Sequence, residues 1–375
     1  MDYMGIAASH YQRGEYKEAL EFFEKAAPAH GFNAWYNAGV CHEHLRNYER
    51  ALTSYYTALE LQPNHPSTLN NIGFALHELG RGTEARDYVE KAYALSPENR
   101  HIGPNALSVW CNNAPMEEWP VLCQKILGNN NALPEHKYLA SIYMACAFWA
   151  LKQEHFPIEF PAPAQGYNWI KNIGVYQTHL QRLAEQKDES IYYDAKPVFM
   201  IGDSHVLSYA GLEFNGRKIT PQLVFGAKAF HIASEAPNRY LTAFKTHTDR
   251  LEEGSALLCC FGEIDCRIDE GILAYQRKIE RNLENIVEEQ VARYIQAVRN
   301  LAPKLDITFV NIPAPHPSIG DRREVIKLFN EQLSQQANII DVYKASLGRD
   351  GYAHEESHID DVHLKPSVFK KALLA

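Results

Sequence analysis

The sequence predicts two kinds of structure in one chain, an all-helical repeat array followed by a three-layer α/β domain with a parallel sheet. Two observations carry this prediction. Small and aromatic residues recur every 32 to 34 positions in the first hundred residues, which is typical of stacked helical hairpins. From Lys196 onward, short apolar runs alternate with amphipathic stretches, as in parallel strands that are connected by helices.

The composition indicates a folded, acidic protein. The chain has 375 residues, of which 46% are hydrophobic and 22% charged, with a net charge of −9; this length suits two ordinary domains. Nucleic acid is not expected as a partner, because phosphate binding needs a basic surface. No apolar run is long enough to span a membrane, and the first residues lack a signal-peptide pattern. Seven scattered cysteines without a CxxC pair predict reduced thiols and a cytoplasmic protein.

The repeats begin close to the N-terminus. Three segments align without gaps: 14–26, 46–63 and 81–97. Ala19, Ala51 and Ala85 hold equivalent positions, where a small side chain lets two helices approach closely. Pro63 and Pro97 each end the second helix of a hairpin. Residues 3–98 therefore resemble tetratricopeptide repeats. This resemblance implies a concave groove for a protein or peptide partner; alternatively, the array only supports the second domain or forms a dimer interface.

A helical region without clear repeats follows. Apolar periodicity predicts helices in three stretches: 117–127, 135–152 and 168–186. The proline-rich stretch 156–166 is expected to be a loop. We therefore expect three parts, with the repeats in 1–100, additional helices and a linker in 101–190, and the α/β domain in 191–375. Because every motif residue discussed below lies after position 201, the last part is expected to fold alone.

The last part is expected to form a parallel sheet. Five apolar runs ending in glycine, proline or an acid predict buried strands: 197–202, 222–226, 256–262, 307–313 and 338–342. Amphipathic stretches predict the intervening helices 237–253, 277–301 and 322–336, and a helix is also expected over 205–214, directly after Ser204. Reactive groups gather at the carboxyl ends of parallel strands. Ser204 lies there, directly after the first run.

Two interpretations of Ser204 are open from its surroundings alone. It is either the N-cap of the following helix or a nucleophile at a turn whose free backbone N–H groups face a developing negative charge. The C-terminal stretch IDDVHLKP favours the second, because Asp360 stands three residues before His363. A serine nucleophile needs a base, and the base needs an orienting carboxylate. Asp361 is a rival for the carboxylate, and a plain surface loop is the alternative to both.

These motifs together resemble the SGNH (GDSL-type) hydrolase family. GDSH at 202–205, Gly226, GEID at 262–265, and the Asp360–His363 pair follow the family's order over residues 196–375. The resemblance implies Ser204 as the nucleophile, His363 as the base and Asp360 as its partner. It also implies an oxyanion hole that includes the backbone N–H groups of Ser204 and Gly226. The expected activity is an esterase or O-acyltransferase for a small-molecule or glycan ester, without a cofactor.

The third motif departs from the family pattern. An asparagine that donates to the oxyanion is replaced by Ile264, and losing one such donor typically costs about 10²–10³ in rate. Glu263, Asp265 and Arg267 are therefore candidates for substrate binding, with Arg267 also a possible replacement donor. A structural salt-bridge cluster is the alternative. His205 is expected to face the same cleft. If the site does not turn over, the chain is instead a non-catalytic interaction protein with a ligand-binding SGNH-like domain.

One apparent metal motif is discounted. HEESH at 354–358 matches the HExxH zinc pattern. That pattern needs a stable helix, which places both histidines on one face. Gly351 precedes it and the Asp360–His363 turn follows at once, so we expect no metal site.

Overall fold

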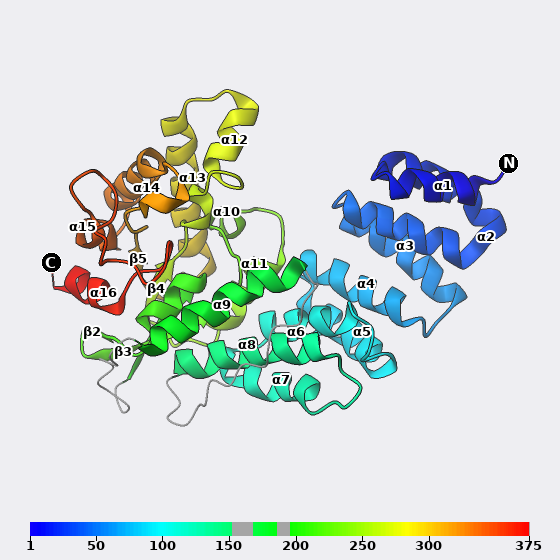
Figure 1. The fold of residues 1–375 in the computed structure, drawn as a ribbon, viewed down its shortest axis with the longest axis horizontal. Coiled ribbons are helices and arrows are strands. Elements are labelled where there is room, and N and C mark those ends of the chain that lie inside the picture. Colours follow the sequence, from blue (N-terminus) through cyan, green and yellow to red (C-terminus); the bar gives the residue numbers. More distant parts are fainter. Residues whose placement is uncertain (152–167, 186–195, 375) are drawn as a thin grey trace. The chain divides into compact units, whose positions relative to one another are not determined.

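The computed structural model describes residues 1–151, 168–185 and 196–374 (Figure 1). The chain forms two compact units. The first contains 1–113, 122–137 and 237–242, and the second contains 114–121, 138–236 and 243–375. This division differs from the expected one at 100 and 190, because the helical residues 138–151 and 168–185 belong to the unit that carries the sheet. The predicted loop 156–166 lies outside the described residues.

The first unit is built from helical hairpins. Its helices are α1 (Tyr3–Gln12), α2 (Tyr16–His44), α3 (Tyr48–Leu61), α4 (Pro66–Glu78), α5 (Gly82–Leu95) and α6 (Ile102–Asn112). The long α2 is broken at Gly31, whose φ is +46°, so its two halves serve successive hairpins. Ala19, Ala51 and Ala85 are completely buried between helices, as the repeat spacing predicted. The division between the units runs through α7 (Trp119–Leu127), α8 (Pro134–Leu151) and α11 (Arg239–Thr248).

The second unit contains a six-stranded sheet of order β2-β3-β1-β4-β5-β6. The strands are β1 (Pro197–Gly202), β2 (Glu213–Phe214), β3 (Arg217–Leu223), β4 (Ala256–Cys260), β5 (Asp306–Val310) and β6 (Ile339–Ile340). All neighbours are parallel except the edge strand β2. Gly202 is in register with Leu223 of β3 and Cys260 of β4. The carboxyl ends of these three strands are therefore level.

The remaining helices of this unit are α9 (Asn168–Glu185), α10 (Ala229–Ile232), α12 (Ile272–Ile279), α13 (Leu283–Leu301), α14 (Arg323–Gln336), α15 (Val342–Ser346) and α16 (Pro366–Leu373). One packed group contains α10, α12, α13 and α14, and another brings α9 and α16 onto the 3₁₀ helix Ser204–Tyr209. Among the described residues, no helix is long and apolar enough to cross a membrane.

Three predicted elements were wrong in extent. The second strand was expected at 222–226, but β3 ends at Leu223; the polar residues Arg217, Lys218 and Thr220 hid its first part from a search for apolar runs. The expected helix 205–214 is a short 3₁₀ helix followed by β2. The expected long helix 277–301 is broken before α13, where Glu280 adopts a left-handed φ of +51°.

Candidate functional site

Ser204 lies at a tight strand-to-helix turn. Gly202 closes β1 in a place where a Cβ atom would collide with the Cys260 carbonyl oxygen. The helix that follows is capped by Asp203, whose carboxylate accepts the His205 backbone N–H at 3.0 Å. Asp203 thus takes the capping role that was the alternative interpretation of Ser204. The serine hydroxyl is left half-buried and directed to another partner.

That partner is His363, in the loop before α16. The Ser204 Oγ lies 2.8 Å from His363 Nε2, and His363 Nδ1 lies 2.9 Å from Asp360 Oδ2. The other Asp360 oxygen accepts the backbone N–H groups of Val362 and His363 at 2.8 and 2.7 Å. The rival Asp361 is exposed and lies 3.7 Å from His316 instead. The structure thus brings Ser204, His363 and Asp360 together in one chain of contacts.

The charge states of this chain follow from its burial. Burial lowers the pKa of His363 below its ordinary value, although the hydrogen bond with Asp360 acts against this. The ring is therefore neutral at pH 7, so a lone pair is available to accept a proton. Burial by itself would raise the pKa of Asp360, but the contacts from His363 and two backbone N–H groups hold it well below its usual range. The carboxylate therefore stays charged beside the imidazole.

His179, in α9, also belongs to this site, although the sequence patterns did not predict it. Its ring stacks on that of His363, with centroids 3.8 Å apart and planes 23° apart. Its Nε2 lies 3.4 Å from Ser208 Oγ, and its Nδ1 lies 3.7 Å from Asp360 Oδ2. Burial, and next the neighbouring His363, lower the pKa of His179 well below its ordinary value. The one available signal was a histidine on an apolar helix face, between Tyr176 and Leu183.

His205 does not offer a free nitrogen to a cleft, contrary to the expectation. Its Nδ1 contacts Asp203 Oδ1 at 2.7 Å, and its Nε2 contacts the Val362 carbonyl oxygen at 3.3 Å. Burial would lower its pKa, but the Asp203 carboxylate outweighs this and raises it. Because both partners accept, the doubly protonated ring suits this position. His205 therefore ties the serine turn to the loop that carries His363.

The acids after β4 are engaged by protein groups. Glu263 is buried and contacts Arg322 at 2.6 Å and Arg267 at 2.9 Å. Asp265 is also buried and accepts the backbone N–H groups of Ala229 and Phe230 at 2.7 and 2.9 Å. Burial raises its pKa to about 6. The salt-bridge alternative thus describes these side chains better than substrate binding, and it leaves Arg267 held by acids.

The candidate donors for an oxyanion are two backbone N–H groups. Ile264 is 8% exposed and carries no polar side-chain atom. Gly226 follows β3 with a φ of +65° and open space beside it. Within the described ranges, neither the Ser204 N–H nor the Gly226 N–H has a hydrogen-bond partner in the protein. Both groups follow strands whose carboxyl ends are level.

One group of side chains has metal-ligand chemistry. Ligand atoms of His179, Asp360 and His363 all lie within 4.8 Å of one another. However, both ring nitrogens of His363 already have partners, Asp360 and Ser204. The hydrogen-bonded chain accounts for this cluster without an ion. The HEESH residues 354–358 are not helical, so their histidines do not form the zinc arrangement.

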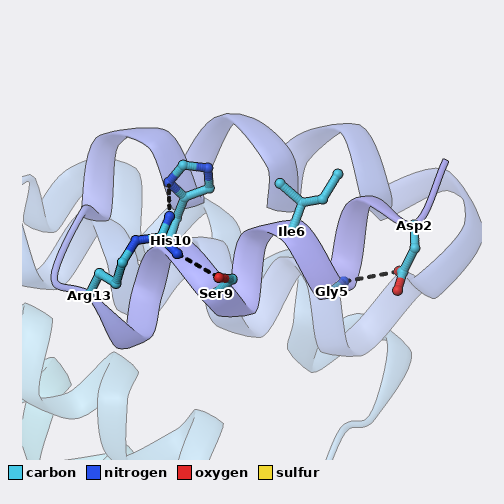
Figure 2. A pocket seen from close by; sticks show the side chains of 6 residues that line it. All are labelled: Asp2, Gly5, Ile6, Ser9, His10 and Arg13. Carbon is cyan, nitrogen blue, oxygen red and sulfur yellow. Dashed lines mark hydrogen bonds between the residues drawn. The ribbon is translucent and has the colours of Figure 1, made fainter.

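The repeats carry two surface features of their own. A shallow depression of about 420 Å³ follows one face of α1, where polar groups bond to one another, with Arg13 reaching Ser9 and Asp2 capping Gly5 (Figure 2). In addition, half-buried asparagines recur every 34 residues on successive helices, at Asn37, Asn71 and Asn105. This second spacing was not among the predicted repeat positions.

Comparisons with known proteins concern mainly the repeats. Tetratricopeptide repeat models match residues 3–30 and 32–98. The anaphase-promoting complex subunit 6 of Dictyostelium discoideum is 40% identical over 60 residues, which cover 16% of this chain and 7% of that protein. The photosystem I assembly protein Ycf3 of Rippkaea orientalis is 31% identical over 105 residues, which cover 27% and 61%. The chain thus spans less than two thirds of these relatives.

Similar solved structures are distant. A tetratricopeptide repeat protein from Parabacteroides merdae is 13% identical with a TM-score of 0.37, covering 88% of this chain and 98% of that one. The lipase Lip_vut3 from a goat rumen metagenome is 16% identical with a TM-score of 0.31, covering 48% and 96%. Neither likeness is close enough to assign a function. The family matches confirm the prediction for the first hundred positions: residues 3–98 of this chain are tetratricopeptide repeats.

Proposed function

We propose that the second unit is a serine-dependent acyl-transfer site, an esterase or O-acyltransferase for a small-molecule or glycan ester. The observation that carries this proposal is the contact chain from Ser204 through His363 to Asp360, at 2.8 and 2.9 Å. A hydroxyl is a weak nucleophile at neutral pH, and a neutral imidazole within hydrogen-bond reach activates it. The carboxylate orients the ring and stabilises its protonated form.

The reaction follows from these groups. Ser204 Oγ forms a bond to the ester carbonyl carbon while its proton moves to His363 Nε2. The tetrahedral intermediate then breaks its bond to the alcohol oxygen, which takes that proton as it leaves. Water attacks the resulting acyl-serine in an esterase, or a second hydroxyl does so in a transferase. His363 takes the attacking proton and returns it to Ser204.

The unpartnered N–H groups of Ser204 and Gly226 support an oxyanion site. Preorganised donors of this kind usually supply the largest part of the rate enhancement in acyl transfer. Two backbone donors without a third from position 264 are expected to give a slow enzyme for simple esters. Selection for a particular acyl group or acceptor would then rest on contacts outside this motif.

Labelling with a fluorophosphonate probe tests the proposal. We expect covalent labelling of the full chain, complete loss in Ser204→Ala and in His363→Ala, and strong weakening in Asp360→Asn but not in Asp361→Asn. Ser318→Ala is a matched control, because the exposed Ser318 also contacts a histidine, His316 Nδ1, at 2.8 Å, but the carboxylate beside that ring, Asp361, lies 3.7 Å from the same nitrogen and not behind the opposite one. Labelling that persists without Ser204 would refute the assignment.

A second candidate function is ligand binding without turnover. Ile264 favours it, because the usual side-chain donor is missing, and the family matches concern interaction repeats and not an enzyme domain. This candidate predicts no fluorophosphonate labelling at all, in a protein whose thermal unfolding shows that it is folded. The same experiment therefore distinguishes the two functions.

For the first unit we infer a protein or peptide partner. Curved arrays of stacked helices present extended concave surfaces for binding. Asn37 and Asn105 each use one amide N–H within the array, for the Asn33 carbonyl oxygen and the Asn70 side chain, which leaves a second N–H for the main chain of an extended segment. Asn71, between them in the series, donates to Tyr36 and Tyr55 instead. A photo-cross-linking residue at position 37 should capture a partner in cells, whereas one at the exposed Glu60 should not. Seven buried cysteines, none of them in a disulfide, support a reducing compartment such as the cytoplasm.

A further inference from the structure

One cavity of the sheet-bearing unit has the features of a ligand site. Its volume is about 450 Å³, and it lies among α10, α12, α13 and the loop before α12, all labelled in Figure 1 except that loop. Small-molecule pockets typically fall in the range of about 300–1,000 Å³. The chain of contacts at Ser204 contributes none of the lining residues.

The walls of this cavity are apolar and its mouth is aromatic. Ile272 and Ile286 are buried on its lining, at 6% and 5% exposure. Phe230 and Tyr275 also line it, yet they are 56% and 51% exposed. Large side chains left exposed beside one cavity indicate a surface that is covered when a ligand is bound.

Two hydrogen-bond donors on α13 lack partners within the described part of the chain. The side-chain nitrogen of Gln290 is buried without an acceptor. Arg293 makes no hydrogen bond or ion pair with any of the described residues. They are three positions apart and share one helix face with Ile286, so both donors lie beside the apolar wall. A buried unsatisfied donor is costly, and such a group calls for an explanation.

The other charges of the cavity are already matched. Arg281 pairs with Glu289 at 3.1 Å, and Lys228 pairs with Glu270 at 3.2 Å. Asp265 is occupied by two backbone N–H groups. Among the described arginines and lysines that line the cavity, Arg293 is therefore the one that remains for a ligand. A planar guanidinium beside an amide N–H₂ suits a carboxylate, which can accept from both.

We propose that this cavity binds a small amphipathic carboxylate. The acid group accepts from Arg293 and Gln290, and an apolar or aromatic body lies between Phe230, Tyr275 and Ile272. This binding does not depend on ester chemistry, because none of its residues belongs to the Ser204 contact chain.

Calorimetric titration of the full chain carrying Ser204→Ala, with 4-phenylbutyrate as the probe, tests the proposal. We expect binding, and affinity at least about tenfold weaker for the neutral 4-phenylbutyramide, since tenfold corresponds to about 1.4 kcal/mol. Arg293→Gln and Gln290→Leu should each weaken the acid to a similar degree. Arg299→Gln, the same charge change on α13 outside the cavity, should leave the affinity unchanged.

Three results would overturn the proposal. The acid and the amide could bind equally, which would make the cavity a purely apolar docking surface. Arg299→Gln could weaken binding as much as Arg293→Gln, which would show that the affinity depends on the net charge of the protein and not on a contact with Arg293. Finally, the acid could fail to bind at millimolar concentration. Because Arg293 is exposed, its substitution leaves the fold intact and keeps the test decisive even if Gln290→Leu does not fold.

Discussion

Replacing Arg322 should strongly destabilise the sheet-bearing unit. Arg322 and Glu263 are 4% and 5% exposed and meet at 2.6 Å. Removing one partner of a buried pair typically costs about 3–5 kcal/mol, because the other charge is left without compensation. Glu263 keeps its contact with Arg267 at 2.9 Å in this variant, so we expect Arg322→Met to lie at the lower end of this range, at about 3 kcal/mol. Arg323→Gln is a matched control, since the neighbouring Arg323 pairs with Asp321 on the surface and should contribute less than about 1 kcal/mol.

The pKa of Glu263 gives a magnitude for all its charged neighbours together, of which Arg322 is one. Burial alone would raise it, but Arg267, His205 and Arg322 together lower it from 4.5 to about 2. A difference of this size is worth on the order of 3 kcal/mol. Because the folded pKa is the lower one, this stabilisation is present above pH 4.5 and is lost as the pH falls towards 2. The Arg322→Met variant should lose part of this acid-sensitive stability.

A variant that replaces both Glu263 and Arg322 tests whether Glu263 contributes only to stability or also to the reaction. Replacing both partners by apolar residues is often close to neutral, so Glu263→Met with Arg322→Met should recover most of the loss. The assay is urea unfolding followed by hydrogen exchange in peptides from β1 and β4, which reports this unit alone. A double variant as unstable as Arg322→Met would refute the reasoning. A stable double variant that loses fluorophosphonate labelling would show that Glu263 acts in the reaction.

Three further predictions concern the Ser204 site. Burial lowers the pKa of His363, so the labelling rate should already be at its plateau at pH 7 and should fall only on acidification, once the ring gains its proton; a plateau reached only above pH 8 would contradict this. His179→Ala should expose one face of His363 to water and move the acidic fall of the labelling rate to higher pH, whereas His179→Phe, which keeps a ring in the stack, should not; identical pH profiles would show that His179 only fills space. Ile264→Asn should raise the rate on an acetate ester, by at most about 10²–10³, while lowering the melting temperature because an amide enters an apolar position; an unchanged rate would show that position 264 does not reach the oxyanion.

Much of the site could be predicted because its residues lie next to short sequence patterns, such as an apolar run or a fixed spacing. Ser204 follows an apolar run that is a strand of the same extent, Pro197–Gly202. Asp360 and His363 are three residues apart, so their contact depends on one short turn. The helices predicted at 135–152 and 168–186 also match α8 and α9 within one residue at each end. Such elements depend on neighbours in sequence, which a pattern search can detect.

Other features depend on contacts between distant segments. His179 lies 184 positions before His363, and no spacing rule relates a helix residue to a loop so far along the chain. The sequence around the acids after β4 does not indicate which arginine pairs with them, because Arg322 lies 59 residues away from Glu263. The helical segments 138–151 and 168–185 were assigned to the linker region for the same reason. Since α9 packs on the 3₁₀ helix Ser204–Tyr209, residues 191–375 alone lack part of this unit.

The burial of all seven cysteines has a practical consequence for following how the molecule opens. Only a thiolate reacts with alkylating reagents, and burial raises the pKa of Cys41, for example, to about 12. A folded chain should therefore resist a thiol-reactive mass tag until some segment transiently unfolds. Three of the cysteines lie in the first unit (Cys41, Cys111 and Cys123) and four in the second (Cys146, Cys259, Cys260 and Cys266). The order in which peptides acquire the tag would thus report which unit opens first, without any engineered label.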